Sequence, residues 1–355
     1  MTTKDPRVEA AISHWAPRFV ANGVPLVDFQ EVTAACERWE DWCRLWSARA
    51  AVHEGLGAKA AADGYTVSAA GHYTRAAVCY HFAKFLFVID PAQMRSAHEK
   101  AVACRNRALP YLAPPGERVA IPYEGKQLYG NLRKPAGKSK APVVVMCMGL
   151  DSAKEEMDDY ENRFLARGVA TLAFDGPGQG EAEYDFAICP EYERPAKAVI
   201  DWLGSRGEID VARIGVWGVS LGGYYAPRAA AFEPRIKACV ALSGPFARSA
   251  SFEGRPSINV DTFRVRSKSA TLEDAGKVAA RISLAGVAKN IRCPIYIVAG
   301  TKDRLTPHTE AERLAREVSG PCVLSIIEGG NHVVNNLWYR YRDQTADWLA
   351  NELRG

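Results

Sequence analysis

Two regions with different patterns of hydrophobic positions make up the chain. Up to about residue 112, apolar residues recur three and four positions apart, which predicts helices throughout. From residue 114 onward, short apolar runs alternate with amphipathic stretches, which predicts strands that alternate with helices. The tripeptide Pro114-Pro115-Gly116 separates the two patterns, as expected of residues that interrupt regular structure. The sequence therefore predicts a helical N-terminal cap domain over residues 1–113 and a second domain over residues 114–355.

The helical region contains a pair of helices expected over residues 67–88 and 91–109, with Pro91 at the start of the second. This pair resembles a tetratricopeptide hairpin, but one such unit favours a helical cap over a repeat array. An earlier helix carries Trp39, Trp42 and Trp46 on one face. That spacing is typical of a core or a domain interface, and a ligand-binding cluster is the alternative.

The second region predicts an α/β fold. Its strands are apolar along their whole length, which is typical of a mainly parallel sheet covered by helices on both faces. Ligands of such sheets bind beyond the carboxyl ends of the strands. The expected strands are 143–148, 169–174, 214–217, 236–242, 294–299 and 322–327. Helices are expected at 157–167, 192–203, 309–318 and 338–353, besides one that begins at Gly223.

Composition and charge narrow the function classes. The chain is 48% hydrophobic and 24% charged, and its net charge of +4 is spread without a basic block, which disfavours a nucleic-acid partner. Nine scattered cysteines form no metal-binding spacing, so we expect no metal site. The N-terminus lacks the apolar stretch of a signal peptide, and no apolar run is long enough to span a bilayer. We therefore expect a cytoplasmic protein without a membrane partner.

The motif with the most chemical content is Gly218-Val219-Ser220-Leu221-Gly222. An apolar strand precedes it and an alanine-rich helix follows, which is the context of a nucleophile elbow. In such a turn the serine occupies a strained corner, and the flanking glycines leave room for it. The alternative is a glycine-rich turn with an incidental serine. The context favours Ser220 as a nucleophile.

A serine nucleophile needs a base, and the base needs an orienting carboxylate. Among seven histidines, His332 follows an apolar strand in a tight polar loop and precedes the last helix. Asp303 follows the strand ending at Ala299. It lies between Ser220 and His332, which is the chain order Ser, Asp or Glu, His that hydrolases with the G-x-S-x-G motif use. A turn aspartate that bonds only its own backbone is the alternative for Asp303. We predict the triad Ser220, Asp303 and His332.

An oxyanion hole requires two backbone N–H groups. One is expected from Leu221, the residue after the nucleophile. The other is expected from the loop after the strand 143–148, where Leu150 is the favoured donor and Gly149 the alternative. The nearby loop 175–181 fits neither phosphate-binding consensus and is interpreted as a tight strand-to-helix crossing beside the site.

Four segments together resemble the α/β-hydrolase superfamily, and more closely its branch of FrsA-like esterases and a carbon–carbon bond hydrolase of nicotine breakdown. The segments are Gly149 to Glu156, Phe174 to Glu181, Gly218 to Ala226 and Gly330 to His332. The resemblance implies an α/β-hydrolase fold, no cofactor and a small-molecule substrate. It also implies that Ser220 attacks a carbonyl, His332 transfers the proton and Asp303 orients the imidazole.

In the carbon–carbon cleaving relative, a further glutamate after the strand that follows the nucleophile helix assists the reaction, and Glu253 matches it best here. A solvated carboxylate is the alternative for Glu253. The resemblance favours cleavage of a carbon–carbon bond beside a ketone in an aromatic or heteroaromatic acyl compound. A carboxylesterase or lactonase with the same triad is the alternative, and a non-catalytic ligand receptor is a third reading.

Aromatic side chains could line an apolar pocket under a lid of about residues 245–284. The candidates are Tyr224, Phe252, Tyr73 and Tyr80, with core packing as the alternative for each. The helical cap could also form a homodimer.

Overall fold

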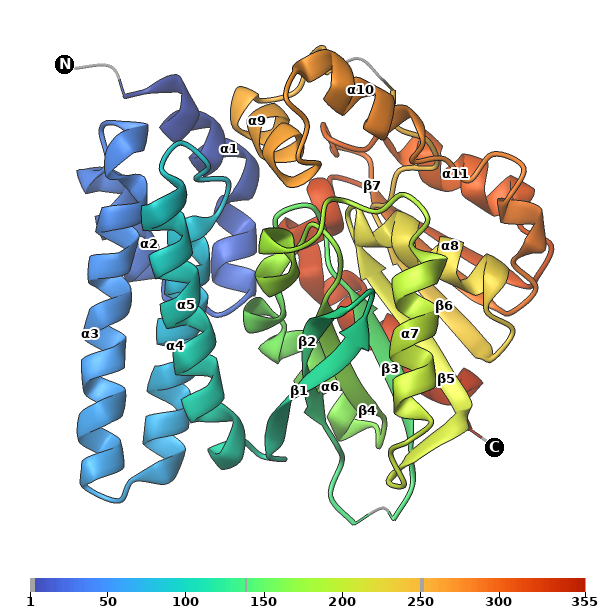
Figure 1. The fold of residues 1–355 in the computed structure, drawn as a ribbon, viewed down its shortest axis with the longest axis horizontal. Coiled ribbons are helices and arrows are strands. Elements are labelled where there is room, and N and C mark those ends of the chain that lie inside the picture. The colour runs from blue at the N-terminus through green and yellow to red at the C-terminus, as the bar shows by residue number, and fades with distance from the viewer. Residues whose placement is uncertain (1–3, 138, 250–251, 355) are drawn as a thin grey trace. The chain divides into compact units, whose positions relative to one another are not determined.

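The computed structural model describes residues 4–137, 139–249 and 252–354 (Figure 1). Its contacts divide the chain into two compact units. The first unit, here the helical unit, comprises residues 1–118, 155–159 and 254–262. The second, here the sheet unit, comprises residues 119–154, 160–253 and 263–355. Two short segments from beyond residue 118 thus group with the N-terminal helices. No helix of the described residues is both long and apolar enough to cross a bilayer.

The helical unit is built from five long helices, as its hydrophobic pattern predicts. The side chain of Asp5 caps the first helix by accepting a bond from the N–H of Arg7, and Asp90 caps the fifth in the same way through Gln93. The helices are α1 (Pro6–Ala21), α2 (Leu26–Ala35), α3 (Trp42–Ala62), α4 (Thr66–Lys84) and α5 (Pro91–Ala108).

An aromatic cluster forms the core of this unit. Trp39, Trp42 and Trp46 are at most 1% exposed. The ring of Phe19 stacks on Phe82 at 3.8 Å and lies 5.1 Å from the ring of Trp46. The indole N–H of Trp42 donates to the carbonyl of Phe82 at 2.9 Å, which satisfies a buried polar group. The three tryptophans therefore act as core residues within this unit.

An eight-stranded sheet forms the sheet unit, in the order β1-β2-β4-β3-β5-β6-β7-β8. Strand β2 pairs antiparallel with β4, and the strands from β4 to β8 pair in parallel, which confirms the predicted mainly parallel sheet. The strands are β1 (Gly116–Tyr123), β2 (Lys126–Arg133), β3 (Ala141–Cys147), β4 (Ala170–Asp175), β5 (Ile209–Val219), β6 (Ile236–Leu242), β7 (Ile295–Gly300) and β8 (Cys322–Ile327).

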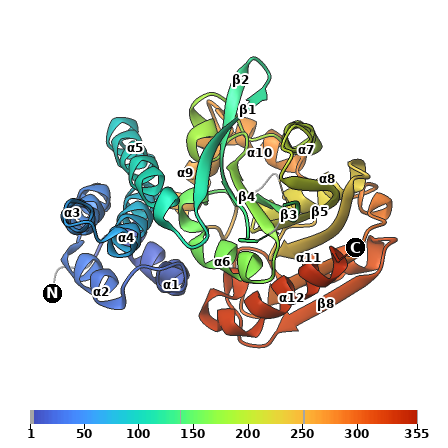
Figure 2. The ribbon, with the colours of Figure 1, turned by 90° about the horizontal axis from the view of Figure 1, so that it is seen from below.

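Helices cover both faces of this sheet. Helices α7 and α8 lie on one face and α12 on the other (Figure 2). The α-helices that follow β3 in the chain are α6 (Asp158–Ala166), α7 (Glu193–Leu203), α8 (Gly222–Phe232), α9 (Ser257–Arg266), α10 (Leu272–Ala280), α11 (His308–Glu317) and α12 (Arg342–Glu352).

The last helix begins later than the sequence predicts. The expected start at residue 338 is wrong, because residues 332–340 form short 3-10 turns and α12 starts at Arg342. The chain is left-handed at Val333 and Val334, with φ of 60° and 53°, which no regular helix accommodates. The apolar pattern continues through these turns, so the sequence alone does not reveal the break.

Candidate active site

Ser220 occupies a sharp corner between β5 and α8. Its φ is 57°, a left-handed conformation that costs a non-glycine residue about 1–3 kcal/mol. The N–H of Ser220 donates to the carbonyl of Leu242 at 2.8 Å, which ties the corner to the end of β6. Backbone strain of this kind is typical of a residue that must present its side chain above a sheet.

The glycines on either side of Ser220 are sterically required. A Cβ at Gly218 would lie 1.9 Å from the carbonyl oxygen of Gly222, and a Cβ at Gly222 would lie 2.1 Å from the carbonyl oxygen of Cys147. Both contacts are with backbone, which cannot rotate away as a side chain can. The helix therefore packs against the sheet as closely as the motif predicts.

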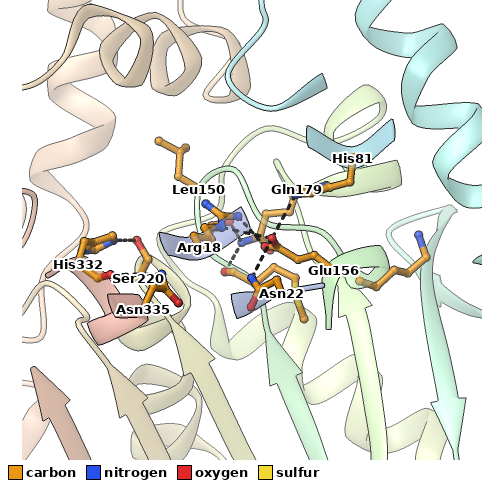
Figure 3. Close-up of polar contacts among 12 residues, drawn as sticks. Arg18, Asn22, His81, Leu150, Glu156, Gln179, Ser220, His332 and Asn335 are labelled. Carbon is orange, nitrogen blue, oxygen red and sulfur yellow. Dashed lines mark hydrogen bonds and ion pairs between the residues drawn. The ribbon is translucent and has the colours of Figure 1, made fainter. Parts of the chain in front are cut away.

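The three predicted triad residues come together at the carboxyl ends of β5, β7 and β8. His332 Nε2 lies 2.8 Å from Ser220 Oγ (Figure 3). On the other side of the ring, His332 Nδ1 lies 2.8 Å from Asp303 Oδ2. The second carboxylate oxygen of Asp303 accepts bonds of 2.9 Å from the N–H groups of Leu305 and Thr306. These distances fit a carboxylate that orients the imidazole while the other ring nitrogen accepts the serine proton.

The loop of His332 is held from β6. Ser243, the residue after that strand, is buried and its Oγ accepts a bond of 3.0 Å from the N–H of Val333. Its own N–H donates to the carbonyl of Val298 on β7 at 2.8 Å. Ser243 thus joins the ends of two strands to the residue that follows the histidine.

Backbone N–H groups near Ser220 are available for an anion. A Cβ at Gly149 would lie only 3.2 Å from the Cβ of Ser220, so the predicted oxyanion loop passes directly beside the serine. Among the described residues, no hydrogen bond engages the N–H groups of Gly149, Leu150 or Leu221. Unpaired donors beside a nucleophile are what stabilisation of an oxyanion requires.

A buried ion pair lies behind this loop. Lys154 Nζ contacts Asp175 Oδ2 at 2.7 Å, with both side chains at most 1% exposed, and also contacts Glu181 at 2.7 Å. Burial alone would raise the pKa of Asp175, but the neighbouring ammonium outweighs it and the net pKa lies below its usual value. The carboxylate also accepts bonds from the N–H groups of Lys154 and Glu181. The pair fixes the loop 175–181 to the segment that follows Gly149.

The two proposed pocket residues of the sheet unit differ in how far they are buried. Tyr224 is fully buried, and its hydroxyl donates to the carbonyl of Pro190 at 2.7 Å. Phe252 is half-buried, with its ring 5.6 Å from that of Phe263. Glu253 is exposed. Residues 250 and 251 of the expected lid lie outside the described residues.

The other two pocket candidates lie on α4 of the helical unit. Tyr80 is buried and its hydroxyl donates to Glu54 at 2.9 Å. The ring of Tyr73 lies where a Cβ at Gly57 would approach within 2.9 Å, so it packs closely against α3. Contact of any of these aromatic residues with substrate stays a prediction.

Three side chains of metal-ligating type gather inside the helical unit. Ligand atoms of Asp28, His53 and Cys79 lie within 4.8 Å of one another. The carboxylate of Asp28 accepts a bond of 2.6 Å from Arg49 and lies 2.6 Å from His53 Nε2. Because the guanidinium already provides its counter-charge, the ion-pair network accounts for this cluster without a metal.

A second buried polar cluster of the helical unit was not anticipated from the sequence. Glu156 accepts a bond of 2.6 Å from Arg18, contacts Asn22 at 3.3 Å and lies 3.5 Å from His81 (Figure 3). Burial would raise the pKa of Glu156, yet the charges of Arg18 and His81 hold it well below its usual value. The glutamate therefore stays ionised in the interior of the unit.

The residues that support the site were also missed by sequence reasoning. They are Lys154, Asp175, Gln179 and Ser243. Asp175 and Gln179 lie in the loop 175–181, which the sequence indicates only as a tight crossing, and Lys154 lies in the segment Gly149 to Glu156, which carries the family resemblance. No local pattern distinguishes Ser243, because its partner is 90 positions away.

Comparison with known proteins identifies the family. A family model described as Esterase FrsA-like matches residues 30–354. The 2,6-dihydropseudooxynicotine hydrolase of Paenarthrobacter nicotinovorans is 33% identical over 99% of this chain and 95% of its own. A crystal structure of 2,6-dihydroxy-pseudo-oxynicotine hydrolase has a TM-score of 0.87, with 95% of each chain covered at 33% identity.

More distant relatives match only part of their own length or share only the fold. The hydrolase acrC of Aspergillus aculeatus is 36% identical over 57% of this chain and 52% of its own, so the match spans about half of that protein. The solved structure of AbyA5 has a TM-score of 0.72 at 18% identity, which shows the fold alone. From the full-length matches, the chain is a hydrolase with the α/β-hydrolase fold and belongs to the family of FrsA-like esterases.

Proposed function

We propose that the chain is a serine hydrolase in which Ser220, His332 and Asp303 form the catalytic triad. The observation that carries the proposal is the continuous chain of two 2.8 Å contacts from Asp303 through His332 to Ser220. The backbone N–H of Leu221 and one from Leu150 or Gly149 would stabilise the oxyanion. No cofactor is needed, since water supplies the second nucleophile.

The proposed substrate is an aromatic or heteroaromatic acyl compound whose carbon–carbon bond lies beside a ketone. The full-length likeness to a 2,6-dihydropseudooxynicotine hydrolase supports this class. Ser220 Oγ adds to the ketone carbon as its proton passes to His332. The carbon–carbon bond then breaks, and the leaving carbon departs with the electron pair and takes up a proton. Water, activated by His332, releases the acyl group as a carboxylic acid.

Glu253 is the proposed acid for the leaving carbon. A carbanion must be protonated at carbon, whereas an alcohol leaving group accepts its proton directly from His332. The position of Glu253 in the segment after β6, with an exposed side chain, is compatible with a role at the mouth of the site.

An esterase or lactonase using the same triad is the second candidate, and the match to an esterase family model over most of the chain favours it. Steady-state turnover of aryl diketones and of matched aryl esters distinguishes the two. We expect ketone cleavage, and rapid ester turnover without ketone cleavage would replace the first proposal with the second. Stoichiometric labelling of Ser220 by a fluorophosphonate distinguishes the two enzyme candidates from a non-catalytic ligand receptor. An unreactive serine would support the receptor.

A cytoplasmic location and a homodimer complete the proposal. All nine cysteines are free, and burial raises the pKa of each thiol, as at Cys189, where it is about 11. Unpaired cysteines fit a reducing compartment. Light scattering on the purified chain tests the dimer, and a monomer mass across the working concentration range contradicts it.

A further inference from the structure

The loop beside Ser220 has its carbonyl groups held by buried side chains. Gln179 Nε2 donates to the carbonyl of Met148 at 2.5 Å and to that of Gly149 at 2.8 Å. Arg266 Nη1 donates to the next carbonyl, that of Leu150. Three successive carbonyls of one loop are thus bonded from two segments that are distant in the sequence.

Peptide geometry converts these bonds into an orientation of the N–H groups. In a planar trans peptide the C=O of one residue and the N–H of the next point in opposite directions. The bond to the Met148 carbonyl therefore turns the N–H of Gly149 away from Gln179. The bond to the Gly149 carbonyl turns the N–H of Leu150 away in the same manner. Both N–H groups are unengaged among the described residues, as is that of Leu221.

Gln179 is itself rigidly placed. It is 1% exposed, and its Oε1 accepts a bond of 3.3 Å from the hydroxyl of Tyr192. The Tyr192 ring is fully buried and stacks on Tyr225 at 3.8 Å. Because two carbonyls face one end of the amide, only the orientation with Nε2 toward them satisfies the contacts. The side chain thus acts as a fixed double donor.

We infer that Gln179 is a positioning residue for the oxyanion hole, which fixes the backbone N–H groups of Gly149 and Leu150 for the anion formed on attack by Ser220. The inference rests on the proposed function, since it assumes that a tetrahedral oxyanion forms there. Pre-oriented donors stabilise developing charge without reorganisation during the reaction. Gln179 acts through the loop and has no contact with the reacting atoms in this account.

The test compares two ligands that differ only in their ability to form an oxyanion. An aryl trifluoromethyl ketone adds to the serine as a hemiketal anion, whereas the matching trifluoromethyl carbinol cannot. Gln179→Met keeps the length of the side chain and removes both donors. We expect its affinity for the ketone to fall about 100-fold and kcat to fall by a similar factor, with carbinol affinity and KM nearly unchanged. Tyr192→Phe, which leaves both carbonyl bonds in place, should retain the preference for the ketone.

The outcomes separate the inference from the proposed function. If the ratio of ketone to carbinol affinity is the same in Gln179→Met as in the wild type, the inference is wrong, whatever the change in stability. If the wild type itself shows no preference for the ketone and no fluorophosphonate labelling, the proposed function fails and the inference with it. Gln179→Leu, which also removes both donors, is assessed by the same ratio should the methionine variant not fold.

Discussion

Ser243 Oγ accepts a hydrogen bond of 3.0 Å from the backbone N–H of Val333, the residue that follows His332. The two residues after the histidine, Val333 and Val334, are both β-branched and both left-handed. Such residues avoid this conformation, so surrounding contacts must hold it. Ser243 supplies one such contact and is itself left-handed, with φ of 47°. The position of the imidazole therefore depends on a strained turn that is fixed from the neighbouring strand.

Replacement of Ser243 by alanine should release this turn. We expect kcat to fall about tenfold, the factor that corresponds to loss of one buried hydrogen bond, while KM changes little. Ser205→Ala is the matched control, since it removes an exposed serine hydroxyl bonded to the Trp202 carbonyl at 2.7 Å. Steady-state kinetics on both variants measure the effect. Equal kcat in Ser243→Ala and Ser205→Ala would show that the turn holds without Ser243.

The proximity of Ser220, Asp303 and His332 could be predicted because the order of elements brings these residues together. Ser220, Asp303 and His332 each follow an apolar strand, and the carboxyl ends of parallel strands meet at one edge of the sheet. Local pattern and chain order were enough to name them. Ser243 follows a strand and Gln179 lies in a glycine-rich turn, but each bonds the backbone of a loop that is distant in the sequence. No local pattern shows which loop will lie beside them. Their roles become visible only once the backbone is placed.

The bounds of the helices and of the two units are likewise only partly predictable from the sequence. The parallel sheet and the long helices follow from periodicity, which reflects burial of one face or of a whole strand. Periodicity does not predict that residues 155–159 and 254–262 group with the N-terminal helices, because both segments are short and lie far from those helices in the sequence. The late start of α12 at Arg342 likewise depends on a left-handed turn within an apolar stretch.

Asp303→Asn should nearly abolish turnover while the fold survives. The N–H groups of Leu305 and Thr306 require an oxygen, so the new amide would present its NH₂ to His332 Nδ1. His332 Nδ1 would then have to accept a hydrogen bond, so the imidazole proton would lie on Nε2. A protonated Nε2 cannot accept the proton of Ser220. We expect kcat to fall by about 10³ to 10⁴, with Ser220→Ala as the reference for complete loss of the nucleophile.

Thermal denaturation of Asp303→Asn checks that the fold is retained, and titration of activity with fluorophosphonate checks the serine. A loss of less than tenfold in kcat would contradict the assigned role of Asp303.

Gly218→Ala should prevent the nucleophile turn from forming. The added methyl would lie 1.9 Å from the carbonyl oxygen of Gly222, so the start of α8 must move away from the strand. We expect loss of activity together with a fall in the free energy of unfolding of several kcal/mol, the order seen for overpacked interiors or more. Gly207→Ala is the control, because a Cβ there meets no atom within 4 Å and its φ is not left-handed. Similar stability of the two variants, measured by urea denaturation, would contradict this account.

Lys154→Met should reverse the way stability responds to pH. In the wild type the pKa of Asp175 lies below its usual value of 3.8, so the contribution of the ion pair is present above that pH and is lost as the pH falls through the lowered pKa. Without the ammonium, burial raises the pKa of Asp175. The variant would then bury a neutral acid at low pH and lose stability as the pH rises through the raised pKa.

At neutral pH we expect Lys154→Met to lower the free energy of unfolding by about 3–5 kcal/mol, since it leaves a buried carboxylate without its partner. Lys197→Met is the matched control, because Lys197 contacts Asp201 at 2.6 Å with 63% of its side chain exposed, and exposed pairs contribute little. Urea denaturation from pH 3 to pH 8 measures both variants. If Lys154→Met loses stability toward low pH as the wild type does, Asp175 is not held ionised by Lys154, and the support we assign to the loop behind Gly149 must come from its backbone bonds instead.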